Sequence, residues 1–368
     1  MISRLRSSIW TTIFVLLMAA GAYATFLRFA YGFSASTNLS DQFPWGLWIG
    51  FDVLCGVGLA AGGFTLVATV HIFNIERYKP ILRPAILTAF LGYLLVCAAL
   101  MFDLGRPWRI WPPLIMWNHH SVMFEVGWCV TLYTTVLALE FSPVVFEKLG
   151  WEAPLKVIHA ISVPLMILGV LLSTLHQSSL GTLYLIFPEK LHPLWYSPML
   201  PIFFFISSVA VGLAMTIFES WHSSRAFNRA LELPLLQGMG RLLAVLLSFY
   251  LVLRLVDLAS RGSLGYATEG SIESYLFLVE IGMLALAAIL LFQNWVVEKP
   301  SALYGSAVLM IFGFITNRLN VSITGIERSS GTHYIPRWSE VAVTLAIIAF
   351  GFAAFRLAVK KLPIFSEA

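Results

Sequence analysis

Three ionisable side chains lie in apolar stretches with no opposite charge next to them in the sequence: Asp52, Glu125 and His176. A charged group inside a membrane is costly, so it has a partner, contacts water or performs a function. Glu125 follows Phe124 within an apolar run, where a carboxyl group is suited to proton transfer. Gln177 and two serines follow His176 and add hydrogen-bond donors and acceptors. We therefore expect Asp52, Glu125 and His176 to carry acid–base chemistry.

The remaining ionisable groups gather at the two ends of the apolar stretches. Near the ends that carry the three residues above lie Asp103, Arg106, Arg254, Asp257, Glu280 and Glu340, and near the opposite ends lie His71, Glu76, His159, Glu219 and His222. Asp103 with Arg106, and Arg254 with Asp257, are three residues apart on a helix and could simply neutralise each other. Almost no ionisable group falls midway, which argues against a transporter with a midplane ion site. If protons cross the membrane, we expect the path to use Glu280, Asp257, Arg254, His71, Glu219 and His222.

The composition identifies the elements that must position these groups. Of 368 residues, 59% are apolar and 11% are charged, and the mean hydropathy is +0.83, which excludes an ordinary soluble domain. Apolar runs long enough to cross a bilayer recur without a polar block between them. They cover roughly residues 10–31, 50–73, 83–103, 122–141, 155–176, 199–221, 240–258, 275–295, 302–317 and 340–358. The sequence predicts an all-α integral membrane protein with about ten transmembrane helices, forming a single transmembrane domain over residues 1–368.

The chain contains an internal repeat. Asp103-Leu104-Gly105-Arg106 and Glu125-Val126-Gly127 have counterparts in Asp257-Leu258-Ala259-Ser260-Arg261 and Glu280-Ile281-Gly282. Both matches are four helices apart, so the copies share one orientation in the membrane. We expect two four-helix bundles, helices 2–5 (residues 50–177) and helices 6–9 (residues 198–320), with helices 1 and 10 flanking them. Gly58 and Gly62 in the second helix predict close approach of a neighbouring helix.

The distribution of charge predicts the orientation. Fourteen of the 23 Lys and Arg residues fall on the face that carries both termini, and nine fall on the other. The positive-inside rule then places both termini in the cytoplasm. The first helix could instead be read as a signal peptide ending at Ala22-Tyr23-Ala24, but its apolar stretch is too long for one. The basic residues are spread over short loops, so no nucleic-acid partner is expected.

The outer groups suit a lipid-soluble redox carrier. Reduction of a quinone takes two electrons and two protons, and the headgroup needs hydrogen-bond donors beside an opening to lipid. We expect Asp52, Asp103, Arg106, Glu125, His176 and Gln177 to line such a pocket. Two alternatives stay open, an ion or proton translocator and a haem-bearing cytochrome b, whose axial ligands could come from His71, His159 and His222. Cys55, Cys97 and Cys129 are isolated, which argues against an iron–sulfur cluster or other metal bound by this chain.

Several motifs resemble those of the NrfD-like, or polysulfide-reductase-type, membrane subunits. They are Phe43-Pro44-Trp45-Gly46-Leu47-Trp48 leading into Gly50-Phe51-Asp52, then Asp103-Leu104-Gly105-Arg106-Pro107-Trp108-Arg109, and His120-Ser121-Val122-Met123-Phe124-Glu125. Within that family the chain looks most like the hydrogenase-2-type integral membrane subunits. The likeness covers most of the chain and is strongest over residues 38–181.

This resemblance implies a quinone-interacting membrane anchor in a respiratory oxidoreductase of the bacterial inner membrane. It implies exchange of electrons between menaquinone or ubiquinone and a periplasmic ferredoxin-like iron–sulfur subunit, with no haem in this chain. A catalytic subunit such as an [NiFe] hydrogenase would complete the complex, and the chain alone would be non-catalytic or the quinone-reactive part. The acidic residue that the family carries on its fourth helix matches Glu125, while Asp52, Arg106 and His176 match motif positions of less defined role.

Overall fold

The computed structural model describes residues 2–365, and in this range the chain forms helices and no strand. Ten helical segments are long and apolar enough to cross a membrane, which confirms the expected all-α membrane architecture. The spans are α1 (Ile2–Tyr31), the composite second helix (Trp48–Ile72), α5 (Leu82–Asp103), α7 (Val122–Leu149), α8 (Glu152–Thr182), α9 (Leu200–Ala226), α10 (Leu233–Ser260), α11 (Ile272–Leu291), α13 (Pro300–Leu319) and α15 (Trp338–Lys361). The short helices α2 (Phe33–Ser36), α6 (Pro112–Ile115), α12 (Asn294–Glu298) and α14 (Gly325–Ser330) lie in or beside the connections.

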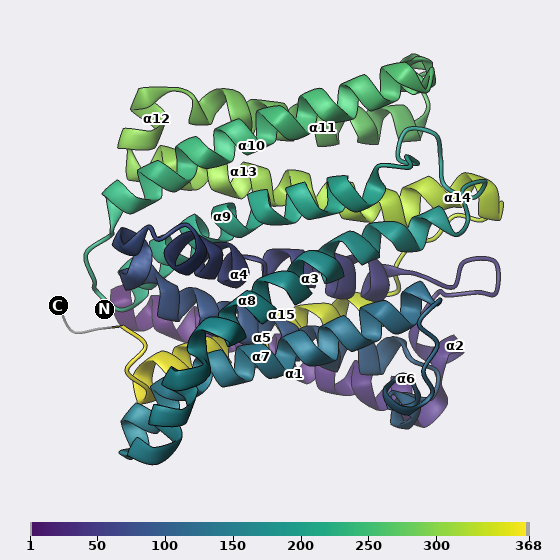
Figure 1. The fold of residues 1–368 in the computed structure, drawn as a ribbon. Coiled ribbons are helices and arrows are strands. Elements are labelled where there is room, and N and C mark those ends of the chain that lie inside the picture. Colours follow the sequence, from purple (N-terminus) through teal and green to yellow (C-terminus); the bar gives the residue numbers. More distant parts are fainter. Residues whose placement is uncertain (1, 366–368) are drawn as a thin grey trace.

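The spans run side by side, so the molecule has two ends (Figure 1). One end, at the left of Figure 1, is where α1 begins and α15 ends, and we call it the terminal face. The other end carries α2, α6 and α14, and we call it the loop face; its connections are 32–47, 104–121, 183–199, 261–271 and 325–337. Glu125, in the first turn of α7, lies at the loop face.

The helix contacts fall into two groups and a flanking pair. In the first half, α7 packs on α8, and α5 packs on α7 and on the second helix. In the second half, α9, α10, α11 and α13 pack on one another, while α1 pairs with α15, which rests on α5. Contacts also join the two halves, because α8 and the second helix both pack on α9. The division into two repeats stays a prediction.

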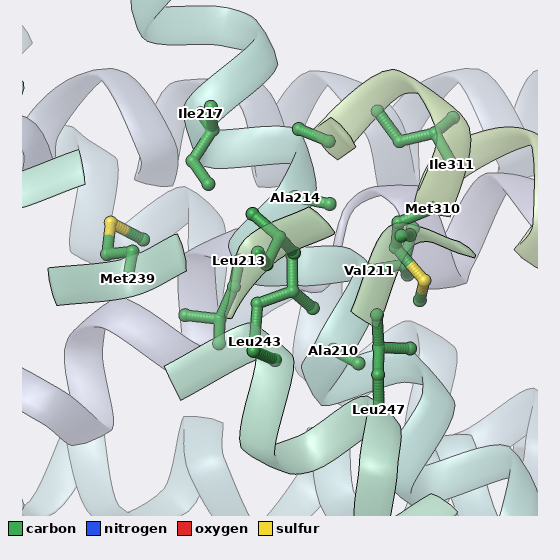
Figure 2. Close-up of a cluster of buried hydrophobic side chains, with 14 of the residues drawn as sticks. Ala210, Val211, Leu213, Ala214, Ile217, Met239, Leu243, Leu247, Met310 and Ile311 are labelled. Carbon is green, nitrogen blue, oxygen red and sulfur yellow. The ribbon is translucent and has the colours of Figure 1, made fainter. Parts of the chain in front are cut away.

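The core of the second half is built from small and branched side chains. Figure 2 shows Ala210, Val211 and Ala214 of α9 close to Leu243 and Leu247 of α10. Met310 and Ile311 of α13 complete this cluster. Lipid offers apolar contacts as readily as protein does, so helices in a membrane associate by close packing rather than by escape from water. Alanines on α9 permit that packing.

The second helix is irregular and glycine-rich. It consists of the π-helical segment Trp48–Cys55, the α-helices α3 (Gly56–Leu59) and α4 (Gly62–Val67), and a second π-helical segment, Ala68–Ile72. A Cβ on Gly58 would clash with the Phe314 ring of α13, and one on Gly62 would lie 3.1 Å from the Gly212 carbonyl of α9. The expected close packing at Gly58 and Gly62 is confirmed. These glycines let the second helix lie against helices of the other half.

Candidate functional site

Glu125 stands at the boundary between the lipid-facing and buried sides of α7. Its side chain is exposed, and its Oε1 accepts a 2.6 Å hydrogen bond from the Ser179 hydroxyl of α8. No cation pairs with it among the salt bridges of residues 9–365, whose side chains the structure describes. On the helix surface its neighbours are Trp128, three residues on, and buried Cys129, four residues on. Glu125 can therefore meet a lipid-soluble ligand on one side and the protein interior on the other.

Behind Glu125 the interface of α5, α7 and α8 holds buried polar groups that lack partners. In the described part of the chain neither ring nitrogen of His176 has a hydrogen-bond partner, whereas the hydroxyls of Tyr93 and Tyr133 lie close to Ser173, and that of Tyr93 also to Gln177, without a well-formed hydrogen bond. The Tyr93 ring lies 4.7 Å from that of Tyr133 and 5.8 Å from that of His176, between centroids. Each group left without a partner costs about 1–3 kcal/mol. Such a concentration of unpaired donors and acceptors is typical of a place that binds water or a polar ligand.

Gln177 adjoins this cluster but is already engaged. Its amide nitrogen donates to the Val57 carbonyl of the second helix at 3.1 Å, and its Oε1 accepts from the Ser208 hydroxyl of α9 at 2.7 Å. Gln177 thereby joins three spans and fixes the end of α8 that carries His176. This gives it a structural role in addition to the expected one in ligand binding.

Asp52 and Asp103 belong to a separate group at the loop face. Asp52 accepts a 2.8 Å hydrogen bond from Thr344 of α15, and Asp103 lies close enough to interact with it electrostatically. The cation near Asp103 is Arg28 of α1, which donates to the Phe102 and Leu104 carbonyls at 2.7 Å. The alternative that Asp103 and Arg106 neutralise each other is not realised, because the Arg106 side chain is exposed and no salt bridge joins the two. Of the six residues expected to line one pocket, Asp52 and Asp103 thus interact with α15 and α1, whereas Glu125 bonds to α8. The shared pocket stays a prediction.

The second half carries the counterparts of these residues in a fully bonded state. Glu280 is buried and accepts hydrogen bonds from Trp195 (2.9 Å), Asn317 (2.7 Å) and Asn320 (2.9 Å). Asp257 forms its salt bridge with Arg261 at 2.8 Å. The alternative that Arg254 neutralises Asp257 is therefore wrong, since Arg261, one turn further on, occupies the carboxylate.

Arg254 and Arg318 bury their guanidinium groups in the same half. Arg254 donates to the Leu194 carbonyl at 3.0 Å, and its Cζ lies 5.2 Å from the Phe203 ring. Arg318 donates to Asn317 and Ser207, and its Cζ lies 3.6 Å from the Phe204 ring. Beside them a small cavity lined by Ser207, Tyr250 and Asn317 has room for about one water molecule. The Nε atoms of Arg254 and Arg318 have no hydrogen-bond partner among the described residues, so this half too retains buried polar atoms that are unpaired.

The groups expected near the opposite membrane surface do lie toward the terminal face. His71 and His222 are exposed, and His222 Nε2 is 3.1 Å from the Tyr304 hydroxyl. Glu219 of α9 accepts a 3.1 Å hydrogen bond from Thr88 of α5. No hydrogen bond of the described residues connects these three with one another.

The histidines expected as possible haem ligands differ in burial from His176, the other histidine of the spans. His71, His159 and His222, the expected ligands, are all exposed. Of the histidines in residues 2–365, His176 and His192 are buried. His192 lies in the connection between α8 and α9, where its backbone nitrogen donates to Gly325 and burial lowers the pKa of its ring.

Four residues of the buried cluster and its surroundings were not predicted from the sequence: Tyr93, Tyr133, Ser173 and Glu140. Glu140 of α7 is mostly buried, and its Oε1 has no hydrogen-bond partner in the described chain. The helical spacing of polar residues in the sequence does indicate this interface. Glu125, Cys129, Tyr133 and Glu140 fall on one side of α7 by helical periodicity, as do Gly169, Ser173, His176 and Ser179 on α8. Two polar stripes on consecutive helices indicate a shared interface.

Comparison with known proteins identifies relatives of the whole chain. The family described as polysulphide reductase, NrfD, matches residues 35–328. The chain is 38% identical to a protein of Nitratidesulfovibrio vulgaris, over 96% of this chain and 93% of the relative. It is 34% identical to the probable Ni/Fe-hydrogenase 2 b-type cytochrome subunit of Escherichia coli K12, over 92% of this chain and 87% of the relative. It is 28% identical to the menaquinone reductase, integral membrane subunit, of Nitratidesulfovibrio vulgaris, over 97% and 92% respectively.

Proposed function

The chain belongs to the NrfD (polysulphide reductase) family of multi-pass membrane subunits, and from that membership we propose that it exchanges electrons between a partner protein and a membrane quinone. The partners we propose are an iron–sulfur subunit at the loop face and a catalytic subunit such as an [NiFe] hydrogenase. One relative is named as a hydrogenase subunit and another as a menaquinone reductase subunit, which supports this proposal. With the bias in Lys and Arg, we place the chain in the bacterial inner membrane with both termini cytoplasmic and the loop face periplasmic.

The observation that carries the proposal is the position of Glu125. Its side chain is exposed and bonded to Ser179, and behind it lie Tyr93, Tyr133 and His176, whose ring nitrogens have no partner among the described residues. A quinone, when bound, would supply a two-electron, two-proton redox carrier. Glu125 would hold or release a proton at its carboxyl, Ser179 would orient that carboxyl, and His176 with the two phenols would offer hydrogen-bond donors. Menaquinone and ubiquinone both fit this donor set.

The decisive experiment uses the intact complex purified from membranes. We expect Glu125→Gln to lower quinone turnover by about 100-fold or more, the range of a lost acid–base group. Glu147→Gln is the matched control, because it lies on the same helix at the terminal face and pairs with Arg83 at 2.8 Å. Reduction of a soluble dye by the catalytic subunit should stay unchanged in both variants. Normal quinone turnover in Glu125→Gln would contradict the proposal.

A second function, proton transfer through the first half, is favoured by one observation. The polar stripe continues from Glu125 through Cys129 and Tyr133 to Glu140, whose Oε1 has no partner among the described residues. We infer that Glu140 conducts protons between the cluster and the terminal face. This route differs from the expected one through Glu280, Asp257 and Arg254, whose side chains are already engaged by protein partners.

Glu140→Gln separates this second function from the first. We expect it to retain quinone turnover while lowering proton uptake from the terminal side of proteoliposomes. Equal proton uptake in the variant and the unmodified complex would exclude the route. We also propose that the chain binds no haem, and a reduced-minus-oxidised spectrum with bands of cytochrome b in the isolated chain would contradict that.

A further inference from the structure

The connection between α5 and α7 folds against the lipid-facing flank of α7 at the loop face. Its short helix α6 packs on α7, and the Trp128 indole nitrogen of α7 donates to the Pro113 carbonyl at 2.9 Å. A Cβ on Gly127 would lie 3.7 Å from Pro113, so the two segments are in van der Waals contact. The connection therefore borders the first turns of α7, where Glu125 lies.

Three aromatic rings meet at this contact. The Trp117 ring lies 5.0 Å from that of Trp128 and 5.9 Å from that of Phe124, and the latter two lie 6.2 Å apart, all between centroids. Trp117 is 67% exposed, so its ring forms the outer surface of the group. We call Trp117, Phe124 and Trp128 the aromatic wall.

The hydrogen bonds of the wall distinguish it from an ordinary aromatic belt. A tryptophan that anchors a protein at the membrane surface keeps its ring in the apolar layer and turns its N–H toward water or headgroups. Here the Trp117 N–H donates to the Leu114 carbonyl at 3.1 Å and the Trp128 N–H donates to Pro113. Both polar atoms are engaged within the protein, and the rings are left as a fixed apolar surface.

The wall adjoins the proposed acid–base group. Trp128 follows Glu125 by three residues and Phe124 precedes it by one, so the wall begins on the lipid side of the Glu125 carboxyl. The buried polar cluster begins on its other side, at Cys129. A molecule with a polar head at Glu125 and a long apolar tail would lay the start of its tail along these rings. An isoprenoid quinone has this shape.

We propose that the aromatic wall is the binding surface for the first isoprenoid units of the quinone tail, and that Trp117 determines preference for long-tailed quinones. This inference rests on the proposed function and adds the residue that distinguishes tailed from tailless substrates. When the quinone enters from the lipid, its tail would stay against Trp117 while its headgroup reaches Glu125.

The test compares two naphthoquinones, a menaquinone with a long isoprenoid tail and menadione, which has the same ring and no tail. The intact complex in proteoliposomes is driven by a reduced viologen dye. We expect Trp117→Ala to raise KM for menaquinone roughly five- to tenfold, as the loss of one packed aromatic ring would, with kcat and the KM for menadione unchanged. Trp117→Phe keeps a ring at the wall and should retain most of the affinity.

Trp108→Ala is the matched control, because Trp108 is 69% exposed in the same connection and contacts no aromatic ring of the described residues. An equal change of KM in Trp108→Ala would indicate a general effect of the membrane surface and would overturn the inference. The inference would also be overturned if Trp117→Ala changed KM for both naphthoquinones or for neither. The same holds if Trp117→Phe raised KM for menaquinone as much as Trp117→Ala.

The variant Glu125→Gln separates failure of the proposed function from failure of this inference. If Glu125→Gln affects turnover of neither quinone, the proposed function itself fails. If Glu125→Gln abolishes both reactions, only the role of Trp117 is in question.

Discussion

At the scale of single residues, the pair of Glu125 and Ser179 can respond to protonation. The Ser179 hydroxyl has one proton and two acceptors in reach, Glu125 Oε1 at 2.6 Å and the Leu175 carbonyl at 2.7 Å. When Glu125 is ionised, the hydroxyl donates to it. When Glu125 is protonated, the carboxyl can donate to Ser179, whose own proton then turns to Leu175. The serine thus keeps Glu125 in place in both states.

Removing that hydroxyl should impair turnover without abolishing it. We expect Ser179→Ala to lower quinone reduction by about tenfold, because a hydrogen bond to a charged group contributes roughly 1.5–3 kcal/mol and water can replace part of it. Ser178→Ala is the control, since Ser178 bonds only to the backbone of its own helix, at Thr174 and Leu175. The measurement is the steady-state rate with a viologen dye as donor. A rate in Ser179→Ala equal to that of the control would show that the serine does not position Glu125.

The sequence predicted some of these residues and not others, for a physical reason. Glu125 and His176 stand out because a lone ionisable group in an apolar run is costly whatever surrounds it. Their environments depend on partners far away in the chain. Thr344, which binds Asp52, is 292 residues from it, and no local pattern indicates that contact. Tyr93 and Tyr133 were missed because a tyrosine in a membrane helix resembles ordinary core until its neighbours are known.

At the scale of elements, the two halves differ in how their polar groups are satisfied. Glu280 in α11 corresponds in the predicted repeat to Glu125 in α7, but Glu280 accepts three hydrogen bonds and is fully buried. Buried polar networks in which every member is satisfied make a structure rigid. Glu125, by contrast, is exposed and accepts one hydrogen bond from the described residues, that of Ser179. We infer that the second half serves as a scaffold.

A stability measurement tests that assignment. In Glu280→Gln an NH2 group replaces one of the two carboxylate oxygens. In one orientation this NH2 faces the donor Asn317, and in the other it faces the donors Trp195 and Asn320. Asn317 cannot reverse its amide without losing its 2.7 Å bond from Arg318. We expect a loss of roughly 1–3 kcal/mol, seen as a lower thermal midpoint in detergent. Glu273→Gln, at the partly exposed start of the same helix, should leave the midpoint unchanged; equal midpoints in all three proteins would refute the scaffold role.

The spans themselves were predictable because hydropathy is a property of local sequence, and all ten are present. The irregular turns were not. The π-helical segment Trp48–Cys55, which carries Asp52, and another at Asn320–Thr324 lie against each other at the loop face. A Cβ on Gly50 would lie 2.5 Å from the Ser322 hydroxyl oxygen. This contact between segments of the two halves depends on tertiary packing, so hydrophobic periodicity does not indicate it.

At the scale of the whole molecule, the two halves meet where α9 packs on α8 and on the second helix. A Cβ on Gly212 would lie 2.9 Å from backbone atoms of Ala61 and Gly62. We expect Gly212→Ala to push the halves apart and lower the thermal midpoint by several degrees, as overpacking of a core by roughly 1–3 kcal/mol would. Gly282→Ala is the control, because a Cβ there meets nothing within 4 Å. A Gly212→Ala protein as stable as the control would show that the contact between the halves is loose.

The orientation of the whole chain decides from which side electrons and protons arrive. The bias of Lys and Arg predicts that the terminal face is cytoplasmic. Two exposed positions can test this orientation by cysteine labelling. Ala153 lies at the start of α8 on the terminal face, and Thr268 lies in the connection between α10 and α11 on the loop face. In spheroplasts, we expect a membrane-impermeant maleimide to label Thr268→Cys and to spare Ala153→Cys until the membrane is opened; inverted vesicles should give the reverse. The native thiols should contribute little, because Cys55 and Cys129 are buried and Cys97 is partly so. Labelling of Ala153→Cys in sealed spheroplasts would show the opposite orientation, with the terminal face outside the cell. An iron–sulfur partner at the loop face would then have to be cytoplasmic.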